Sequence, residues 1–299
     1  MGMESPEYQL DFEVTAYFVI KDDFETKMWD GSRITFYKSE GTNKGSIIYQ
    51  MATLNHGEAK EEGKKRANAF LNYLIITSNI DNIKPTIFAE SPRLLNSDKF
   101  KGKTLTLTKT FTSDSIILAN FQKQWAECAN SLSSKIHGLS TMKQAAIDRC
   151  LFWLRKGAEA ASVERFIYRW VSFEALSGVL DDKSDSTDKW VNSLINKLAN
   201  ESAKTVFNGN KAVAKQLEAA SLISWKGLNR SQELKEAIGG LERNGDYKTV
   251  MMRTASCIHE VRNKFLHGGE VISLIDGCNT LLKELTHALL KDLSKDTQN

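Results

Sequence analysis

The sequence predicts an α+β protein with a small N-terminal antiparallel sheet, one helix packed on it, and a C-terminal all-α bundle. Apolar and polar residues alternate in the first part of the chain and recur with helical spacing after about residue 113. All three prolines, which interrupt helices, precede that point. The length of 299 residues also exceeds what one hydrophobic core usually accommodates, which favours two domains.

Strands are expected in residues 1–112, because this part has stretches rich in β-branched and aromatic residues separated by Gly, Asn and Asp. These stretches are Tyr8–Ile20, Arg33–Lys38, Gly45–Thr53 and Lys103–Phe111. The intervening segment Glu58–Ile76 places Ala67, Phe70 and Leu74 at helical spacing instead. We therefore expect one helix to cover a small antiparallel sheet in this domain.

Helices are expected from Ser113 onward, where the apolar period is helical. The helix Ser115–Ile136 falls in an expected connector, residues 113–140, and residues 141–299 are expected to form a helical domain. Turns at Asn208-Gly209, Gly227 and Asn244-Gly245 are expected to separate the shorter predicted helices. The predicted helices of this domain are Thr141–Ala160, Ser162–Leu180, Thr187–Ala199, Lys211–Ala220, Ser231–Leu241, Asp246–Leu266 and Glu270–Leu293.

Composition indicates a globular chain, with 41% apolar and 26% charged residues. A net charge of +3 is too small to indicate nucleic-acid binding by itself. Neither an apolar run of membrane-spanning length nor a secretory signal pattern is found, so we expect a cytoplasmic protein without membrane contact. The four cysteines lie too far apart for a structural zinc site, and no metal or cofactor is expected.

The segment HEVRNKFLHGGE, His259–Glu270, concentrates Arg, Asn and His near a predicted helix end. Asn263 and His267 are four residues apart and share a helical face. Arg262 and His267 are five apart, which places them about 140° apart around the axis unless the helix ends between them. The glycines that follow His267 predict such an ending, which would let its imidazole turn toward Arg262 and Asn263.

These side chains suit cleavage of RNA by its own 2′-hydroxyl group. Histidine can move a proton near neutral pH, and arginine offers a permanent planar cation to the phosphate. The amide of Asn263 could orient the phosphate or the histidine, and no divalent metal is then needed. A structural role fits the same spacing, since basic groups at the end of a helix offset its dipole and cap its carbonyls.

The string RNKFLHGG resembles the arginine, four-to-six residues, histidine signature of the HEPN superfamily, including the polar residue after the arginine. Upstream, Ala146–Leu176 is similar to the first two helices of the Apea-like and MauJ-like branch of that superfamily. It shows a helix that ends near Gly157, a short link, and a second helix that carries the letters WVSFEAL, Trp170–Leu176. The resemblance covers about half of the chain and leaves residues 1–112 unexplained.

The resemblance implies a helical bundle that forms a homodimer, in which two motifs face each other across one metal-free ribonuclease site. Arg262, Asn263 and His267 occupy the signature positions and are the expected catalytic residues. Active members cut RNA in antiviral defence, abortive infection or toxin systems, whereas others only bind. The alternatives are therefore a non-catalytic dimer that binds RNA or nucleotide, and a toxin that a neighbouring nucleotidyl-transferring enzyme silences as its antitoxin. The N-terminal domain is expected to sense a trigger ligand or to restrain the nuclease.

Three further residues are candidates for supporting roles. Glu174 is expected to be buried within an apolar helix face, where it would pair with Arg262 or form a plain structural salt bridge. Glu260 could pair with Arg262 from the motif helix, and Lys264 could reach a phosphate or be a solvated lysine. His259 lies eight residues before His267, whereas two metal ligands on one helix prefer a spacing of four.

Aromatic residues are frequent in the two predicted helices that precede the motif, where they could stack on bases. Helical spacing favours core or dimer contacts for most of them. They are Phe152, Trp153, Phe166, Tyr168, Trp170 and Phe173.

Overall fold

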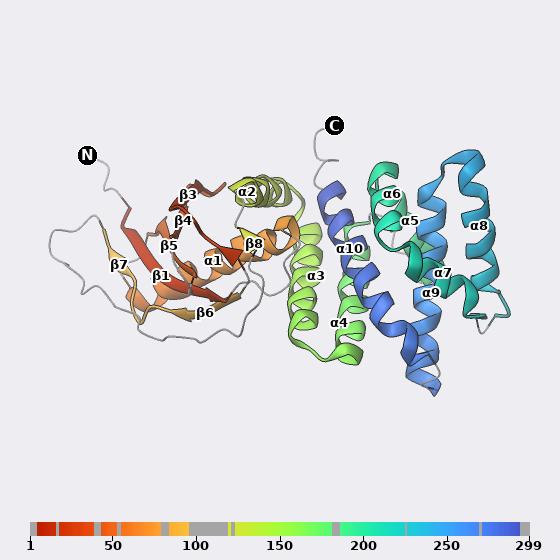
Figure 1. Cartoon of the computed structure of the whole chain (residues 1–299). Coiled ribbons are helices and arrows are strands. Elements are labelled where there is room, and N and C mark those ends of the chain that lie inside the picture. The colour runs from red at the N-terminus through yellow and green to blue at the C-terminus, as the bar shows by residue number, and fades with distance from the viewer. Residues whose placement is uncertain are drawn as a thin grey trace. The chain divides into compact units, whose positions relative to one another are not determined.

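The structure is a computed structural model, and it has the α+β fold class that the sequence predicts. It divides the chain into two compact units, Met1–Ile136 and His137–Asn299, each of which is described by itself (Figure 1). The described residues are 5–15, 18–38, 43–52, 55–78, 84–95, 119–120, 123–180, 186–224, 226–268 and 271–293.

An antiparallel sheet forms the centre of the first unit, with the strand order β3-β4-β5-β1-β6 and with β7 paired to β1. Its strands are β1 Glu7–Thr15, β3 Phe24–Lys27, β4 Arg33–Tyr37, β5 Asn43–Gln50, β6 Lys84–Phe88 and β7 Arg93–Leu94. A separate parallel pair joins β2 Phe18–Val19 to β8 Ala119–Asn120. The strand expected at Lys103–Phe111 lies outside the described residues.

The helix α1, His56–Ser78, packs on the sheet, as the sequence predicts. Alternate residues of β1 face it, and Leu10 is fully buried together with Phe70 of α1. Gly63 lets the helix approach closely, because a Cβ at that position would lie 2.7 Å from the hydroxyl oxygen of Tyr49. The core of the first unit is therefore a layer of side chains between one helix and one sheet face.

The helix α2, Lys123–His137, also belongs to the first unit. The hydroxyl group of Thr77, in the last turn of α1, donates a hydrogen bond of 2.8 Å to the carbonyl oxygen of Trp125. The sequence had suggested a connector over residues 113–140. The described part of that segment packs instead on the first unit until the chain enters the second.

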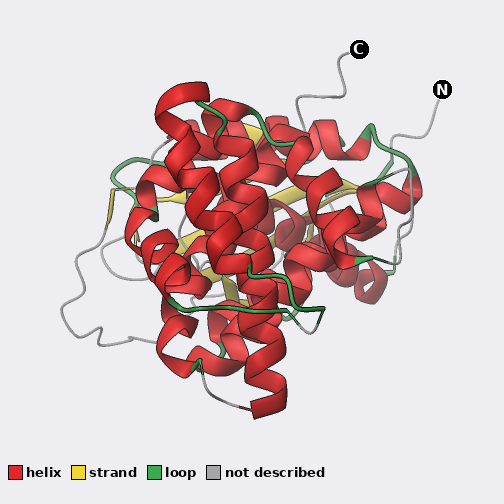
Figure 2. Ribbon diagram, turned by 90° about the vertical axis from the view of Figure 1, so that its right-hand side faces the viewer, coloured by secondary structure: helices red, strands yellow, loops and turns green. Residues whose placement is uncertain are grey.

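The described residues of the second unit form helices joined by loops and contain no strand (Figure 2, helices red and loops green). Its α-helices are α3 Thr141–Glu159, α4 Ser162–Ala175, α5 Thr187–Asn196, α6 Asn200–Gly209, α7 Lys211–Ala219, α8 Arg230–Asn244, α9 Tyr247–Gly268 and α10 Ile275–Leu293. Two 3₁₀-helices, η1 Leu176–Val179 and η2 Ile272–Leu274, follow α4 and precede α10. The helix α6 was not predicted, because Asn208-Gly209 had been interpreted as a turn.

Helices α3 and α4 form an antiparallel hairpin. The hydroxyl group of Ser172 donates a 2.8 Å hydrogen bond to the carbonyl oxygen of Cys150, and both residues are buried. The helix α4 also packs on α10, while α9 contacts α5, α6 and α8. These contacts place α9, which carries the predicted catalytic motif, among several other helices of the bundle.

The helix α9 is unbroken through His267. Its start is fixed by Asp246, which accepts hydrogen bonds from the amide and the hydroxyl group of Thr249 at 3.0 and 2.6 Å. The predicted ending before His267 is wrong, because Gly268 still belongs to the helix. No described helix is long and apolar enough to cross a membrane.

Candidate functional site

Arg262 and Asn263 lie in direct contact on α9. The Nη1 atom of Arg262 donates to Oδ1 of Asn263 at 3.1 Å. The Nδ2 atom of Asn263 lies 3.3 Å from Nε2 of His259, one turn earlier on the helix. All three side chains are half-buried. The carboxamide therefore joins a guanidinium to an imidazole.

This contact also assigns the proton on His259. Asn263 uses its carboxamide oxygen for Arg262, so its NH₂ group faces the ring and Nε2 of His259 accepts. The neutral ring then carries its proton on Nδ1, which lies 3.9 Å from Oε1 of Glu260. The nearby carboxylate of Glu260 therefore favours the tautomer with the proton on Nδ1, in which Nε2 accepts from Asn263.

The ring of His259 packs on an aromatic cluster. It stacks on Trp170 of α4 with ring centroids 5.3 Å apart and planes 24° apart. Burial, aided by the charge of Arg262, lowers the pKa of His259 to about 4. His259 is consequently neutral at pH 7. Sequence reasoning had considered it only as a metal ligand, although the spacing His259, Asn263, His267 places all three on one helical face.

His267 lies in the last turn of α9 and is exposed. On the unbroken helix its Cα position is about 140° around the axis from that of Arg262, so the predicted swing of the imidazole by unwinding does not occur. The long side chain of Arg262 compensates in part, because its guanidinium reaches Asn263 on the face of His267. Among the described residues, no hydrogen bond joins His267 to either partner.

The predicted supporting residues are placed differently from one another. Glu174 is exposed rather than buried, so the expectation of a buried carboxylate is wrong. Glu260 is 4% exposed and faces a pocket beside His259 rather than Arg262. Burial raises the pKa of Glu260, and the charges of Arg230 and Lys264 oppose that shift. Lys264 is half-buried, and its positive charge acts to lower the pKa of Glu260.

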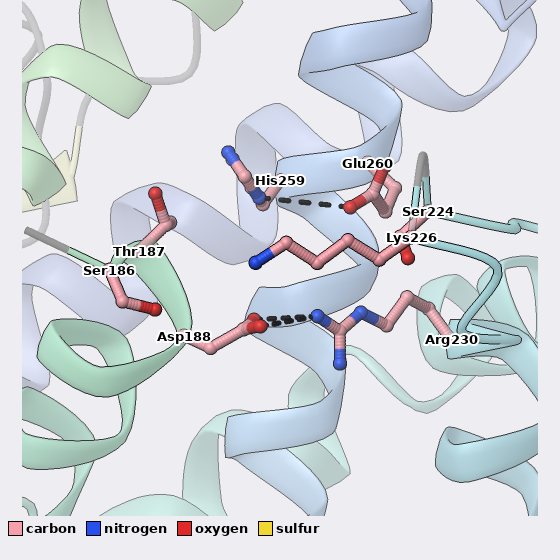
Figure 3. A pocket seen from close by; sticks show the side chains of 8 residues that line it. All are labelled: Ser186, Thr187, Asp188, Ser224, Lys226, Arg230, His259 and Glu260. Atoms are coloured by element: carbon pink, nitrogen blue, oxygen red, sulfur yellow. Dashed lines mark hydrogen bonds and ion pairs between the residues drawn. The ribbon is translucent and has the colours of Figure 1, made fainter.

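A polar pocket of about 390 Å³ opens beside His259 (Figure 3). It lies between the start of α5, the loop before α8, the start of α8 and the middle of α9. Figure 3 shows the side chain of Lys226 extending across it, with the ammonium nitrogen between His259 and Asp188. The lining residues are Ser186, Thr187, Asp188, Ser224, Lys226, Arg230, His259 and Glu260.

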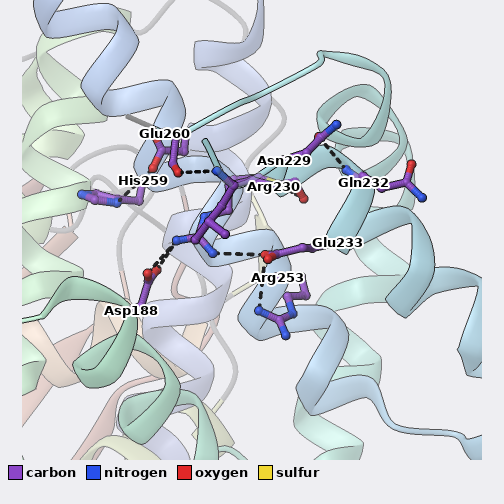
Figure 4. A network of polar contacts seen from close by, with 11 residues as sticks. Asp188, Asn229, Arg230, Gln232, Glu233, Arg253, His259 and Glu260 are labelled. Atoms are coloured by element: carbon purple, nitrogen blue, oxygen red, sulfur yellow. Dashed lines mark hydrogen bonds and ion pairs between the residues drawn. The ribbon is translucent and has the colours of Figure 1, made fainter. Parts of the chain in front are cut away.

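Arg230 lies at the centre of an ion-pair network beside this pocket (Figure 4). Its Nη2 atom lies 2.7 and 2.6 Å from the two carboxylate oxygens of Asp188, and its Nη1 atom lies 3.1 Å from Glu233. Although burial acts to lower the pKa of Arg230, the hydrogen bonds and charges of these two carboxylates raise it. The buried guanidinium therefore remains charged and balanced, and it ties α5 to α8.

Comparison with known proteins gives no relative. No protein-family model, no curated protein and no solved structure matches this chain. Membership of the HEPN superfamily remains a prediction from the motif residues. Among the described residues, no group of three or more His, Cys, Asp or Glu side chains could hold a metal ion.

The two neighbouring arrangements on α9 offer different chemistry. Toward the end of α9, Asn263 holds the guanidinium of Arg262 and lies one turn before the exposed His267, which suits binding of a phosphate diester and movement of a proton. At the pocket, charged groups of both signs and hydroxyl groups surround a neutral imidazole, which suits a small polar ligand. Both arrangements share His259.

Proposed function

We propose that the second unit is a metal-independent endoribonuclease that acts as a homodimer, with α9 of both copies contributing to one composite site. The observation that carries this proposal is the hydrogen bond that holds the half-buried Arg262 on Asn263, which lies one helical turn before the exposed His267. These groups support the proposal because a guanidinium can bind the phosphate and an imidazole can move a proton without a metal.

The proposed reaction is attack of a ribose 2′-oxygen on the adjacent phosphorus. A bond forms between O2′ and phosphorus and the bond to O5′ breaks, which leaves a 2′,3′-cyclic phosphate and a 5′-hydroxyl end. A histidine takes the proton from the 2′-hydroxyl group and gives it to O5′ as that bond breaks. In a homodimer His267 of one copy performs both proton transfers, and Arg262 of the other copy stabilises the charge that develops on the phosphate.

His259 and Trp170 act as positioning residues in this proposal. The stacked, neutral imidazole accepts from Asn263 and thereby fixes the carboxamide that holds Arg262. Glu260, 3.9 Å from Nδ1 of His259, stabilises the required tautomer. The buried aromatic cluster therefore supports the guanidinium through two hydrogen-bonded steps.

An RNA digest in excess EDTA tests the proposal. We expect the wild-type protein to cut single-stranded RNA and to leave 2′,3′-cyclic phosphate ends, and we expect His267→Ala and Arg262→Ala each to lower the rate by about 10² or more. Arg243→Ala is the matched control, since Arg243 is an exposed arginine in the last turn of α8. Equal cutting by the parent and the two motif variants would sink the nuclease proposal.

A second candidate function is a non-catalytic dimer that binds RNA or a nucleotide as a sensor or scaffold. The pocket beside His259, with Lys226 reaching into it, favours this candidate because it offers room for a small polar ligand. Nucleotide binding that is weakened by Lys226→Ala, with no cleavage of any RNA pool, would distinguish it. The control is Lys189→Ala, an exposed lysine of α5 that does not line the pocket.

The cellular setting that we propose follows from the resemblance to the HEPN superfamily. It is a cytoplasmic role in antiviral defence, abortive infection or a toxin system, with an antitoxin or a trigger ligand acting through the first unit. Inspection of neighbouring genes for an antitoxin and a screen of ligands that change the RNA digest test this setting.

A further inference from the structure

An exposed aromatic and basic face lies on the hairpin of α3 and α4. Arg149, Phe152, Trp153 and Lys156 occur at positions i, i+3, i+4 and i+7 of α3, which places them along one side of that helix. Tyr168 of α4 joins them, since its ring stacks on that of Trp153 with centroids 5.4 Å apart and planes 26° apart. We call these five residues the aromatic face.

The aromatic face is not needed for the core. Trp170 and Phe173 of α4 are buried, whereas Phe152 is 52% exposed and Trp153 and Tyr168 are half-buried. The opposite side of α3 already supplies the buried apolar residues of the hairpin, among them Ile147 and Leu154. Large apolar groups that are left in contact with water and with one another commonly mark a binding surface.

Cations flank the exposed rings. The Nζ atom of Lys156 lies 5.8 Å from the centre of the Phe152 ring, and the side chains of Lys156 and Arg149 are both exposed. Two exposed acidic residues border the aromatic face beside Phe152: Asp148 precedes Phe152 by one turn, and Glu159 follows Lys156 by three residues. Burial lowers the pKa of Arg155, and the charge of Glu159 opposes that shift in part. Arg149 and Lys156 are the charged members of the aromatic face, and the two bordering acids lie on the Phe152 side of it.

We propose that the aromatic face binds single-stranded RNA. Bases stack on Phe152 and on the paired rings of Trp153 and Tyr168, while Arg149 and Lys156 contact the phosphates. Seven residues of helix extend about 10 Å along the axis, which accommodates about three bases at the 3.4 Å spacing of a stacked strand. The choice of RNA rests on the proposed ribonuclease function, for which this face would hold substrate outside the cleavage site.

Binding of a non-cleavable oligonucleotide tests this proposal separately from catalysis. The probe is a fluorescein-labelled 2′-O-methyl oligouridylate about 12 nucleotides long, which lacks the attacking hydroxyl group. Fluorescence anisotropy should show binding to the full chain, and Phe152→Ala should weaken it by about fivefold or more. Ile223→Ala is the matched control, because Ile223 is a 51% exposed apolar residue elsewhere in the second unit.

The charge of the face gives a second readout. The double variant Arg149→Ala/Lys156→Ala should weaken binding and reduce the slope of log affinity against log salt by about 1.4, which is about 0.7 for each lost phosphate contact. The control Lys189→Ala/Lys197→Ala removes the same charge from exposed positions of α5 and its C-terminal end. This control should leave the slope nearly unchanged if the contacts are local.

Every outcome decides the proposal. It is overturned if the wild-type chain does not bind the probe, or if the Phe152 and double variants bind as tightly as their controls. It is also overturned if Phe152→Ala changes the sedimentation of the protein and leaves RNA affinity intact, since the face would then contact protein. If binding depends on the face but no RNA is cut, the ribonuclease proposal fails alone.

Discussion

Asn263 is the residue on which the proposed site depends most directly, because it contacts both Arg262 and His259. We expect Asn263→Ala to lower the rate of RNA cleavage by about tenfold, since the guanidinium loses the acceptor that orients it. Asn263→Asp keeps an acceptor but adds a charge that competes with the phosphate for Arg262, and it should lower the affinity for RNA as well as the rate. Single-turnover cleavage over a range of protein concentrations separates these two effects. An Asn263→Ala protein with parental kinetics would contradict the positioning role.

The buried imidazole of His259 makes folding stability depend on pH. Its pKa in the folded protein is about 4, below the ordinary 6.5, because of burial first and Arg262 second. Between these values the unfolded chain binds the proton that the folded chain rejects, so stability rises with pH. This contribution is fully present above pH 6.5 and is lost as the pH falls toward 4.

We therefore expect urea unfolding to show a loss of stability from pH 7 to pH 4, of which His259 contributes at most about 3 kcal/mol. His259→Phe keeps a ring against Trp170 but cannot titrate, and its loss of stability over the same range should be smaller. His287, whose pKa burial lowers to about 3, adds a loss in the same direction that this variant retains. An unchanged pH dependence in His259→Phe would show that the imidazole does not remain neutral in the folded state.

At the scale of single elements, the helix α9 corrects the main structural expectation. The sequence predicted that Gly268 would end the helix before His267, and the structure continues the helix to Gly268. Gly268→Ala tests whether RNA cleavage requires α9 to end before His267. The substitution fits the structure, because a Cβ at this position meets no atom within 4 Å. We expect this variant to raise stability by about 0.5–1 kcal/mol and to leave RNA cleavage unchanged.

The complementary variant at the same position is Gly268→Pro. Proline disfavours the helical conformation of the residue before it, so this change should release His267 from α9 and lower the cleavage rate. The opposite pattern, a slow Gly268→Ala protein and an active Gly268→Pro protein, would show that catalysis requires the last turn to unwind. Far-ultraviolet circular dichroism provides the control for global folding of both proteins.

The elements that the sequence predicts well are those with a long apolar period. The predicted helix Thr141–Ala160 and the observed α3, Thr141–Glu159, differ by one residue. The helix α6 was missed because Asn208-Gly209 is a strong turn pattern, yet Gly209 lies close to Glu284 of α10, where tertiary contacts decide the local structure. The short strands β3 and β7 were missed because two to four residues carry too little periodicity.

At the scale of the whole molecule, the sequence could not predict which residues far apart along the chain contact one another. The motif residues Arg262 and Asn263 were predictable because they are adjacent in sequence. The ion pair of Arg230 with Asp188 joins residues 42 positions apart, and no local pattern indicates that pairing. No local sequence pattern indicates the stack of His259 on Trp170 either. The sequence therefore suggested only metal binding as a possible role for His259.

Assembly is the largest scale at which the proposal can be tested, and mixing two inactive chains tests it. In a composite site, a mixed dimer of one Arg262→Ala chain and one His267→Ala chain retains one guanidinium and one imidazole in the same cleft. If each chain instead held a complete site, every site of the mixed dimer would lack one of these groups. We therefore expect coexpression of the two variants to give RNA cleavage about tenfold above either variant alone.

Two controls accompany this experiment. Sedimentation must show that the mixed species is a dimer. A mixture of Arg262→Ala with Arg243→Ala, which has an intact motif, measures how far the subunits exchange. Cleavage no greater than the sum of the separate variants, in a sample with proven exchange, would place the reaction within single chains and remove the twofold site from the mechanism.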